Sequence, residues 1–161
     1  MSNSPGESKS STVDVDYFRD TPIRYLGYAN ELGESFGPLY PKFVRPSYGI
    51  AFAYVGADTI YKTYLAKKRG ESNETALRIG VDVLLWQTFA SVLIPGKIIN
   101  MVTHASVKAF QSDVPAIKKL PVSVRTWSPT LIGLATIPFI IHPIDNFVDH
   151  VFDRTLRKWW L

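Results

Sequence analysis

A stretch of nineteen residues without formal charge, residues 126–144, lies between Arg125 and Asp145. A helix of this length spans about 28 Å, close to the thickness of about 30 Å of the hydrocarbon core of a bilayer. The stretch also contains Pro138 and Pro143, and acidic residues follow Pro143 at regular spacing. We therefore expect a membrane-spanning helix that ends at Pro143, followed by an amphipathic helix on the membrane surface or against other protein.

Two more apolar stretches, residues 46–61 and 77–100, are expected to be helices that cross the membrane. Each has fewer uncharged residues in a row than a bilayer requires, so flanking lysines and arginines must extend towards the lipid head groups. Pro95 lies inside the second stretch, as Pro138 lies inside the third. A proline within a helix removes one backbone hydrogen bond and bends the helix, so we expect kinked helices that wrap around one another.

Small residues recur at every fourth position of the first apolar stretch, at Gly49, Ala53 and Ala57. A stripe of this kind allows two membrane helices to approach closely, so these residues are predicted to form a helix-packing face. A tightly packed helix of a soluble protein would carry the same stripe, and the spacing alone does not separate the two interpretations.

Two aspartates lie towards the ends of the first two apolar stretches, each with a basic residue four positions away. Lys62 follows Asp58, and Arg78 precedes Asp82. This spacing places the two charges of a pair side by side on a helix. In an antiparallel pair of helices, both ion pairs would lie at the same end. We interpret them as charge pairs at the membrane rim in preference to proton or ion ligands, because acids with such functions are typically deep and unpaired.

The N-terminal region divides into a polar tail and an amphipathic helix. Residues 1–16 are rich in serine and lack the arginine-rich pattern of a mitochondrial presequence, so we expect a disordered polar tail. Residues 17–161 are expected to form a single helical membrane domain. Thr21, followed by proline, is a favourable start for a helix, and Gly37, also followed by proline, is a favourable end. Apolar side chains recur between them at helical spacing, at Tyr25, Leu26, Ala29, Leu32 and Phe36.

Composition and charge exclude several classes of function. The 161 residues include no cysteine, which excludes disulfides, thiolate catalysis and zinc sites built on cysteine. The net charge is +4, and its positive excess lies in connectors at residues 62–78 and 97–125. This distribution favours contact with anionic lipid head groups, such as those of cardiolipin, over contact with nucleic acid.

Side chains suited to catalysis or metal binding are few and poorly spaced. His142, Asp145, Asp149 and His150 are close in sequence, but Pro143 is expected to interrupt their helix. No HExxH metal motif, GxxxxGK[ST] phosphate loop or GxSxG nucleophile motif occurs. We therefore expect no enzymatic activity, no cofactor and no metal site.

Four segments of the sequence resemble segments of a known protein family: RDTPIRYLGYANELGESF, PSYGIAFAYVGADTIYK, WQTFASVLIPGKIIN and LATIPFIIHPIDNFVDH...LRK. Over residues 17–158 the sequence resembles the mitochondrial fission process protein family, also called mitochondrial 18 kDa proteins. The runs at residues 24–30 and 141–145 are the most specific. The positions identified as family signatures or structural positions, without a chemical role, are Arg24, Tyr25, Gly27, Tyr28, Asn30, Pro95, Pro138, His142, Pro143 and Asp145.

The resemblance implies a multi-pass protein of the mitochondrial inner membrane with a role in mitochondrial division, inner-membrane integrity and cell survival or apoptosis. It also implies a link to bioenergetic complexes. With the residue patterns, it leads us to expect an all-α membrane protein with about three apolar helices and amphipathic N- and C-terminal helices. Such a protein would act as a non-enzymatic adaptor or scaffold that binds lipids and inner-membrane proteins.

Three alternatives stay open from the sequence. The chain could be a supernumerary subunit of a respiratory-chain or ATP synthase assembly, which would use the same packed, kinked helices. It could be a transporter or leak pathway that uses Asp58 and Asp82. It could also be a soluble helical bundle.

Overall fold

The described part of the chain is built from helices, so the all-α expectation is confirmed. The computed structural model describes residues 17–160, and the predicted polar tail at 1–16 lies outside the described residues. In chain order the elements are α1 (Tyr17–Asp20), η1 (Pro22–Tyr28), α2 (Ala29–Phe36), η2 (Pro41–Phe43), α3 (Val44–Lys68), α4 (Asn73–Gln87), η3 (Thr88–Leu93), α5 (Ile94–Phe110), α6 (Pro115–Lys118), α7 (Val122–Arg154) and α8 (Leu156–Trp160).

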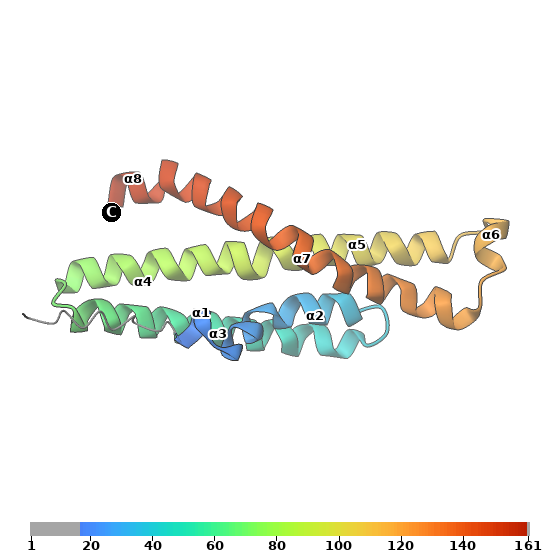
Figure 1. Ribbon diagram of the computed structural model, residues 1–161, viewed down its shortest axis with the longest axis horizontal. Helices are drawn as coiled ribbons and strands as arrows, with labels where there is room; N and C mark the ends of the chain where they lie inside the picture. Colours follow the sequence, from blue (N-terminus) through green and yellow to red (C-terminus); the bar gives the residue numbers. More distant parts are fainter. Residues whose placement is uncertain (1–16, 161) are drawn as a thin grey trace, which may run out of the picture.

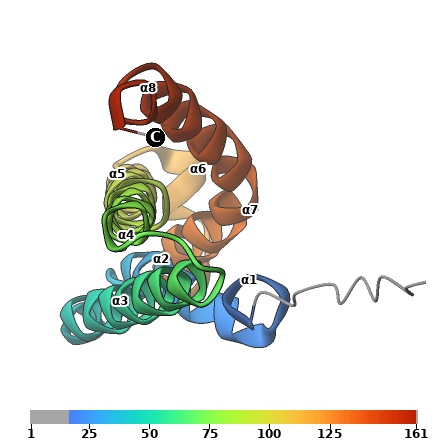
Figure 2. The same ribbon diagram turned by 90° about the vertical axis from the view of Figure 1, so that its left-hand side faces the viewer.

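The helices form an elongated bundle (Figure 1). α3 and α4 lie side by side and antiparallel, whereas α4, η3 and α5 continue one another as a single long rod. After α6 has turned the chain, α7 runs back across α5, its main neighbour, and then arches towards α8. α2 contacts α3, α5 and α7, and the view along the bundle shows these helices around a common interior (Figure 2).

Local sequence determines where the α3–α4 hairpin turns. Gly70 follows α3 and has a φ of +88°, a left-handed conformation that favours glycine. Ser72 then begins α4, since its Oγ accepts a hydrogen bond from the backbone N–H of Thr75 at 3.1 Å. The turn therefore has a favourable end for one helix and a favourable cap for the next.

Two of the described helices, Asn73–Phe110 and Val122–Trp159, are long and apolar enough to cross a membrane. The sequence analysis expected three such helices, and the expectation for residues 46–61 is not met. α3 has the necessary length, but its tyrosines and the charged pair of Asp58 and Lys62 lower its hydropathy. α3 is thus a helix of mixed character beside two apolar ones.

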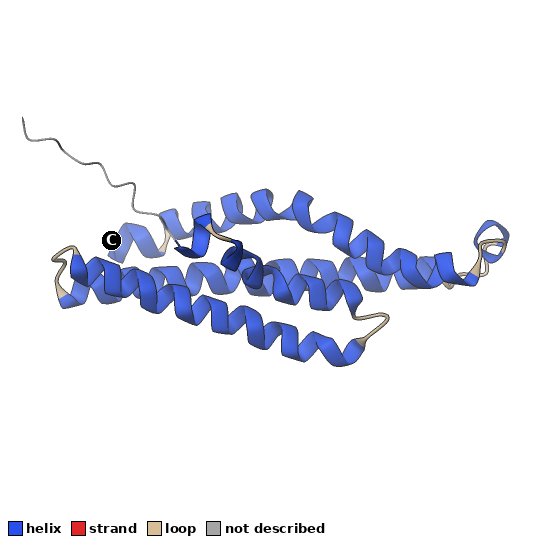
Figure 3. Cartoon of the chain, turned by 60° about the horizontal axis from the view of Figure 1, so that its bottom comes forward, coloured by secondary structure: helices blue, strands red, loops and turns tan. Residues whose placement is uncertain are grey.

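The prediction that a helix ends at Pro143 is wrong. α7 continues from Val122 to Arg154 through Pro129, Pro138 and Pro143, and the break comes at Thr155, where φ is −115° and ψ is −90°. Each proline removes one backbone hydrogen bond, and the helix accommodates the three by bending rather than by ending. Figure 3 shows the resulting curved rod, so the expected separate C-terminal amphipathic helix is the last part of α7.

The segment before Pro95 is π-helical. In η3 the chain contains an i→i+5 hydrogen bond from the Ile94 N–H to the Phe89 carbonyl. A π-turn changes the hydrogen-bond ladder at the point where Pro95, which has no N–H, would otherwise leave a carbonyl without its usual partner. The α4–α5 rod therefore passes its proline without interruption.

The bundle buries many polar side chains beside two small apolar clusters, and it exposes many large apolar side chains. Asn30 and Glu31 on α2 are 0% and 1% exposed, whereas Leu32, the next residue, is 45% exposed. Across the described residues, Phe139 and Ile60 are 78% and 72% exposed. The buried polar or charged side chains are Asn30, Glu31, Glu34, Ser35, Ser47, Asp58, Gln87, Thr103 and Thr130. The N-terminal amphipathic segment thus packs with its polar face inward.

Candidate functional site

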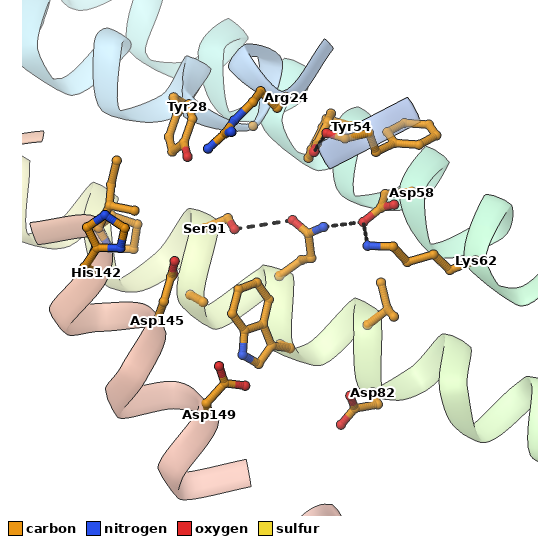
Figure 4. Close-up of a pocket in the computed structure, with 18 of the residues that line it drawn as sticks. Arg24, Tyr28, Tyr54, Asp58, Lys62, Asp82, Ser91, His142, Asp145 and Asp149 are labelled. Carbon is orange, nitrogen blue, oxygen red and sulfur yellow. Dashed lines mark hydrogen bonds and ion pairs between the residues drawn. The ribbon is translucent and has the colours of Figure 1, made fainter. Parts of the chain in front are cut away.

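The polar interior contains a cavity of about 450 Å³ (Figure 4). Its walls come from η1, α2, α3, α4, η3 and α7, with single contributions from α1, α5 and α8. Most of its polar lining is charged: Arg24, Glu31, Asp58, Lys62, Asp82, Asp145, Asp149 and Arg157. Six of the ten predicted signature or structural positions also line it: Arg24, Gly27, Tyr28, Pro95, His142 and Asp145. Residues far apart in the sequence therefore meet at one place.

The segment 24–30 owes its pattern to close packing against α3 and η3. A Cβ on Gly27 would lie 3.0 Å from Cε1 of Tyr54, so glycine leaves room for that ring. Asn30 is fully buried, and its Nδ2 donates to the carbonyl of Val92 at 3.0 Å. This bond ties α2 to the π-helical segment. Tyr25, by contrast, is 67% exposed and points away from the cavity.

Asp58 is the centre of a hydrogen-bonded chain that joins α3 to α4 and η3. Its carboxylate is fully buried, and Oδ2 accepts from Lys62 Nζ at 2.9 Å. The same oxygen accepts a short hydrogen bond from Gln87 Nε2, and Ser91 Oγ donates to Gln87 Oε1 at 3.3 Å. Figure 4 shows this chain along one side of the cavity. Spacing predicted Lys62 as a neighbour of Asp58 but gave no indication of Gln87.

Asp82 is held by a residue that the sequence analysis did not identify. Arg157 Nη2 lies 3.0 Å from Asp82 Oδ2, and Arg157 Nη1 lies 2.9 Å from an oxygen of Asp149 and of Asp153. Arg78, the basic residue predicted beside Asp82, forms an ion pair with Glu74. Arg157 thus connects α4 with the end of α7, and we call this group the Arg157 clamp.

Several buried polar atoms around the cavity have no hydrogen-bond partner among the described residues. They include Glu31 Oε2, Asp58 Oδ1 and Trp86 Nε1. A buried polar atom without a partner is unfavourable by about 1–3 kcal/mol, and a polar cavity of this size can admit water molecules that supply partners. The cavity is therefore suited to hydration. Over residues 17–160, no group of three or more His, Asp or Glu side chains could hold a metal ion.

Close helix contacts in the bundle use glycines that the sequence analysis did not select. Gly33 lies against Ser47, Gly80 against Thr63, and Gly133 against α2 and α5. The predicted packing stripe of Gly49, Ala53 and Ala57 instead faces outward on α3. A Cβ on Gly49 would meet nothing within 4 Å. The stripe therefore makes no close helix contact within the described chain.

The three predicted prolines differ in their burial. Pro95 is buried beside the cavity, and Pro138 and Pro143 are exposed on the outer side of α7. Sequence reasoning did not select Glu31 and Glu34 as site residues, because helical spacing does not report whether a polar face points inward or outward. Their spacing with Asn30 and Ser35 puts all four side chains on one face, which is the signal that could have identified them.

Comparison with known proteins finds one family model and several relatives that match most of the chain. The profile of the Mitochondrial 18 KDa protein family matches residues 17–83 and 73–152. The chain is 50% identical over 153 residues to Mitochondrial fission process protein 1 of Caenorhabditis elegans, with 91% of this chain and 89% of that protein covered. It is 46% identical over 161 residues to the Homo sapiens protein of the same name, with 94% and 92% covered. No solved structure matches the chain.

Proposed function

Because the chain belongs to the Mitochondrial 18 KDa protein family, we propose that it is a non-enzymatic integral protein of the mitochondrial inner membrane. It acts in mitochondrial fission and in the integrity of that membrane, as an adaptor or scaffold for other proteins. Its relatives are named mitochondrial fission process proteins, which supports the mitochondrial role and the role in fission. Its proposed partners are anionic lipids and inner-membrane proteins.

The exposure of large apolar side chains and the burial of polar ones support the membrane part of the proposal. Apolar surface is unfavourable in water by about 25 cal/mol per Å², so exposed side chains such as Phe139 and Ile60 favour a hydrocarbon surrounding. Hydrocarbon also requires that charged groups find partners inside the protein. The ion pair of Asp58 with Lys62 and the Arg157 clamp meet this requirement.

Two fractionation experiments test the membrane location. Alkaline carbonate treatment of mitochondria is expected to leave the protein in the membrane pellet, and removal of the outer membrane is expected to leave it with the inner membrane. A protein that is released by carbonate, or that is monodisperse in buffer without detergent, would contradict an integral location.

The outward stripe on α3 supports the adaptor part of the proposal. Gly49, Ala53 and Ala57 form a flat face of the kind that allows close approach of another membrane helix. We expect Ala53→Leu to block this approach without disturbing the fold, because Ala53 is exposed. Ala135→Leu is the matched control, since Ala135 is an exposed alanine on α7.

Purification from mitochondria in a mild detergent distinguishes the proposed role from its alternatives. Wild type and Ala135→Leu are expected to recover the same inner-membrane protein, and Ala53→Leu to lose most of it. A native gel then measures the ratio of the two proteins. Co-migration in a fixed ratio with a respiratory complex or ATP synthase would support a structural subunit instead. Equal recovery by both variants would contradict binding through the stripe.

A further inference from the structure

A second cavity, of about 570 Å³, lies at the end of the bundle where α5 leads into α6 and α7 begins. One wall comes from the turn between α2 and α3, and the others from the end of α5 and the first turns of α7. Its apolar lining comes from the turn between α2 and α3 and from the ends of α5 and α7 that face it: Leu39, Val44, Val107, Phe110 and Val122. The cavity therefore offers an apolar wall at one end of the molecule.

Arg125 supplies the cavity with a cation whose donors are not fully used. Its side chain is half-buried, and its Nε is buried without a hydrogen-bond partner among the described residues. His104 also lines the cavity. Glu34 is the carboxylate in the lining, but its two oxygens already accept hydrogen bonds, from Tyr48 Oη at 2.9 Å and from Asn100 Nδ2 at 2.8 Å. Arg125 is thus the group available to an anion.

The position of Arg125 along α7 places this cation at a defined depth in the proposed bilayer. Arg125 comes directly before the uncharged residues 126–144, which match the thickness of a hydrocarbon core. A residue at that boundary lies at the level of lipid phosphate groups. Exposed cations surround the same end of the bundle: Lys42, Arg45, Lys108, Lys118 and Lys119. Asp113, an acid in this region, is paired with Lys118 at 2.8 Å.

We propose that this cavity binds the phosphate group of an anionic phospholipid. Arg125 donates to a phosphate oxygen through the guanidinium group, as arginine commonly does with phosphate. An acyl chain of the same lipid lies along the apolar wall that includes Val107 and Phe110. The surrounding lysines favour an anionic over a zwitterionic lipid. The inference rests on the proposed membrane location and adds a specific lipid site to it.

The test measures lipid bound to the full chain, purified and delipidated in a mild non-ionic detergent. The protein is equilibrated with mixed micelles of phosphatidylglycerol and phosphatidylcholine, and the lipid that remains bound is quantified by native mass spectrometry. We expect the wild type to retain phosphatidylglycerol selectively. Arg125→Gln is expected to weaken this binding roughly tenfold, because it removes a charge-assisted hydrogen bond.

Lys119→Gln is the matched control, since it removes the same charge from an exposed position at the same end, outside the cavity lining. It is expected to weaken binding by less than about threefold. Equal losses in the two variants would overturn the site in favour of diffuse attraction by the basic end. Displacement of the lipid by millimolar inorganic phosphate would overturn the assignment to a phospholipid.

A second variant keeps the inference testable if Arg125→Gln does not fold. Val107→Trp leaves every charge in place and fills the space beside the apolar wall of the cavity. It is expected to reduce lipid retention while the detergent-solubilised protein keeps its helical content. Retention equal to the wild type would count against the cavity. A wild-type protein that resists carbonate extraction but retains phosphatidylglycerol no better than phosphatidylcholine overturns the lipid site alone, whereas carbonate release of the wild type overturns the membrane location.

Discussion

At the scale of single residues, the stability of the interior depends on how each buried charge is neutralised. Asp58 is fully buried, and its ion-pair partner Lys62 is partly exposed. A buried carboxylate that loses its counter-ion is strongly unfavourable, and the remaining hydrogen bond from Gln87 compensates for only part of that loss. The stability of the α3–α4 pair therefore depends on the ammonium group of Lys62.

Lys62→Met is expected to lower the free energy of unfolding by about 3 kcal/mol, because it leaves the charge of Asp58 without an ion-pair partner. Unfolding of the detergent-solubilised protein by heat or denaturant measures the change. Lys68→Met, at the exposed end of α3, is the matched control and is expected to change stability by less than about 0.5 kcal/mol. Similar losses in both variants would contradict this role of Lys62.

The partners of buried charges also show how much of the site the sequence contains. Lys62 lies one turn from Asp58 on the same helix, so local spacing is sufficient to suggest it. Gln87 lies 29 residues from Asp58, and Arg157 lies 75 residues from Asp82. Contacts at such separations depend on which helices become neighbours, and local spacing carries no information about that.

At the scale of whole elements, glycines set the distance between helices. α7 passes α2 and α5 at Gly133, where a Cβ would lie 2.7 Å from Thr103 Cγ2 and 3.2 Å from Ser35 Cα. The second neighbour is backbone and cannot rotate away. Gly49 on α3 is the opposite case, since open space surrounds it.

We expect Gly133→Ala to destabilise the bundle by about 2 kcal/mol through overpacking. Gly49→Ala, the same substitution in open space, is expected to raise stability by up to about 1 kcal/mol, because alanine is the better helix former. Unfolding midpoints of the two variants in one detergent provide the measurement. Destabilisation of similar size at both positions would show that helix packing is not the cause.

The Arg157 clamp gives a second prediction for elements. Arg157→Gln is expected to release α8 and the end of α7 from α4, because it breaks contacts with Asp82, Asp149 and Asp153. Hydrogen exchange should then become faster in residues 149–160, with the α2–α3 region unchanged. Arg154→Gln, a nearby exposed arginine on α7, should leave exchange as in the wild type. Faster exchange throughout the chain would indicate global destabilisation instead.

The sequence predicted most helices but not where the last long one ends. Helical spacing predicted helices over residues 46–61 and 77–100, and the uncharged run at 126–144 predicted a helix that lies within α7. Pro143 is an unfavourable residue within a helix, yet α7 continues past it because Ile144, Val148 and Phe152 pack together with Ala90. Tertiary packing of this kind overrides local preference.

At the scale of the whole molecule, the proposed membrane location rests on the distribution of polar and apolar side chains. Polar side chains of α2, α3 and α4 meet in the interior, and many large apolar side chains, such as Phe139 and Ile60, are exposed on the outside. Helical periodicity alone predicted an amphipathic N-terminal helix but not the direction of its polar face. That direction is decided by the solvent, which periodicity does not report.

Cysteine labelling in lipid nanodiscs tests this arrangement directly, because the chain contains no cysteine of its own. A water-soluble maleimide is expected to label Lys119→Cys and to leave Phe139→Cys unlabelled, since Phe139 is 78% exposed on a part of α7 that faces lipid in our proposal. Both variants should react fully after denaturation in SDS. Fast labelling of Phe139→Cys in the nanodisc would contradict a hydrocarbon surrounding.

The hydrogen-bonded chain from Lys62 through Asp58 to Gln87 has a consequence for biogenesis. Lys62 neutralises Asp58 within α3, but the amide that also donates to this buried carboxylate belongs to α4, so α3 alone leaves that hydrogen bond unmade. In the membrane location that we propose, α3 and α4 would therefore have to enter the lipid together, as one hairpin. Arrival of the second helix at the bilayer then becomes the event that commits the first.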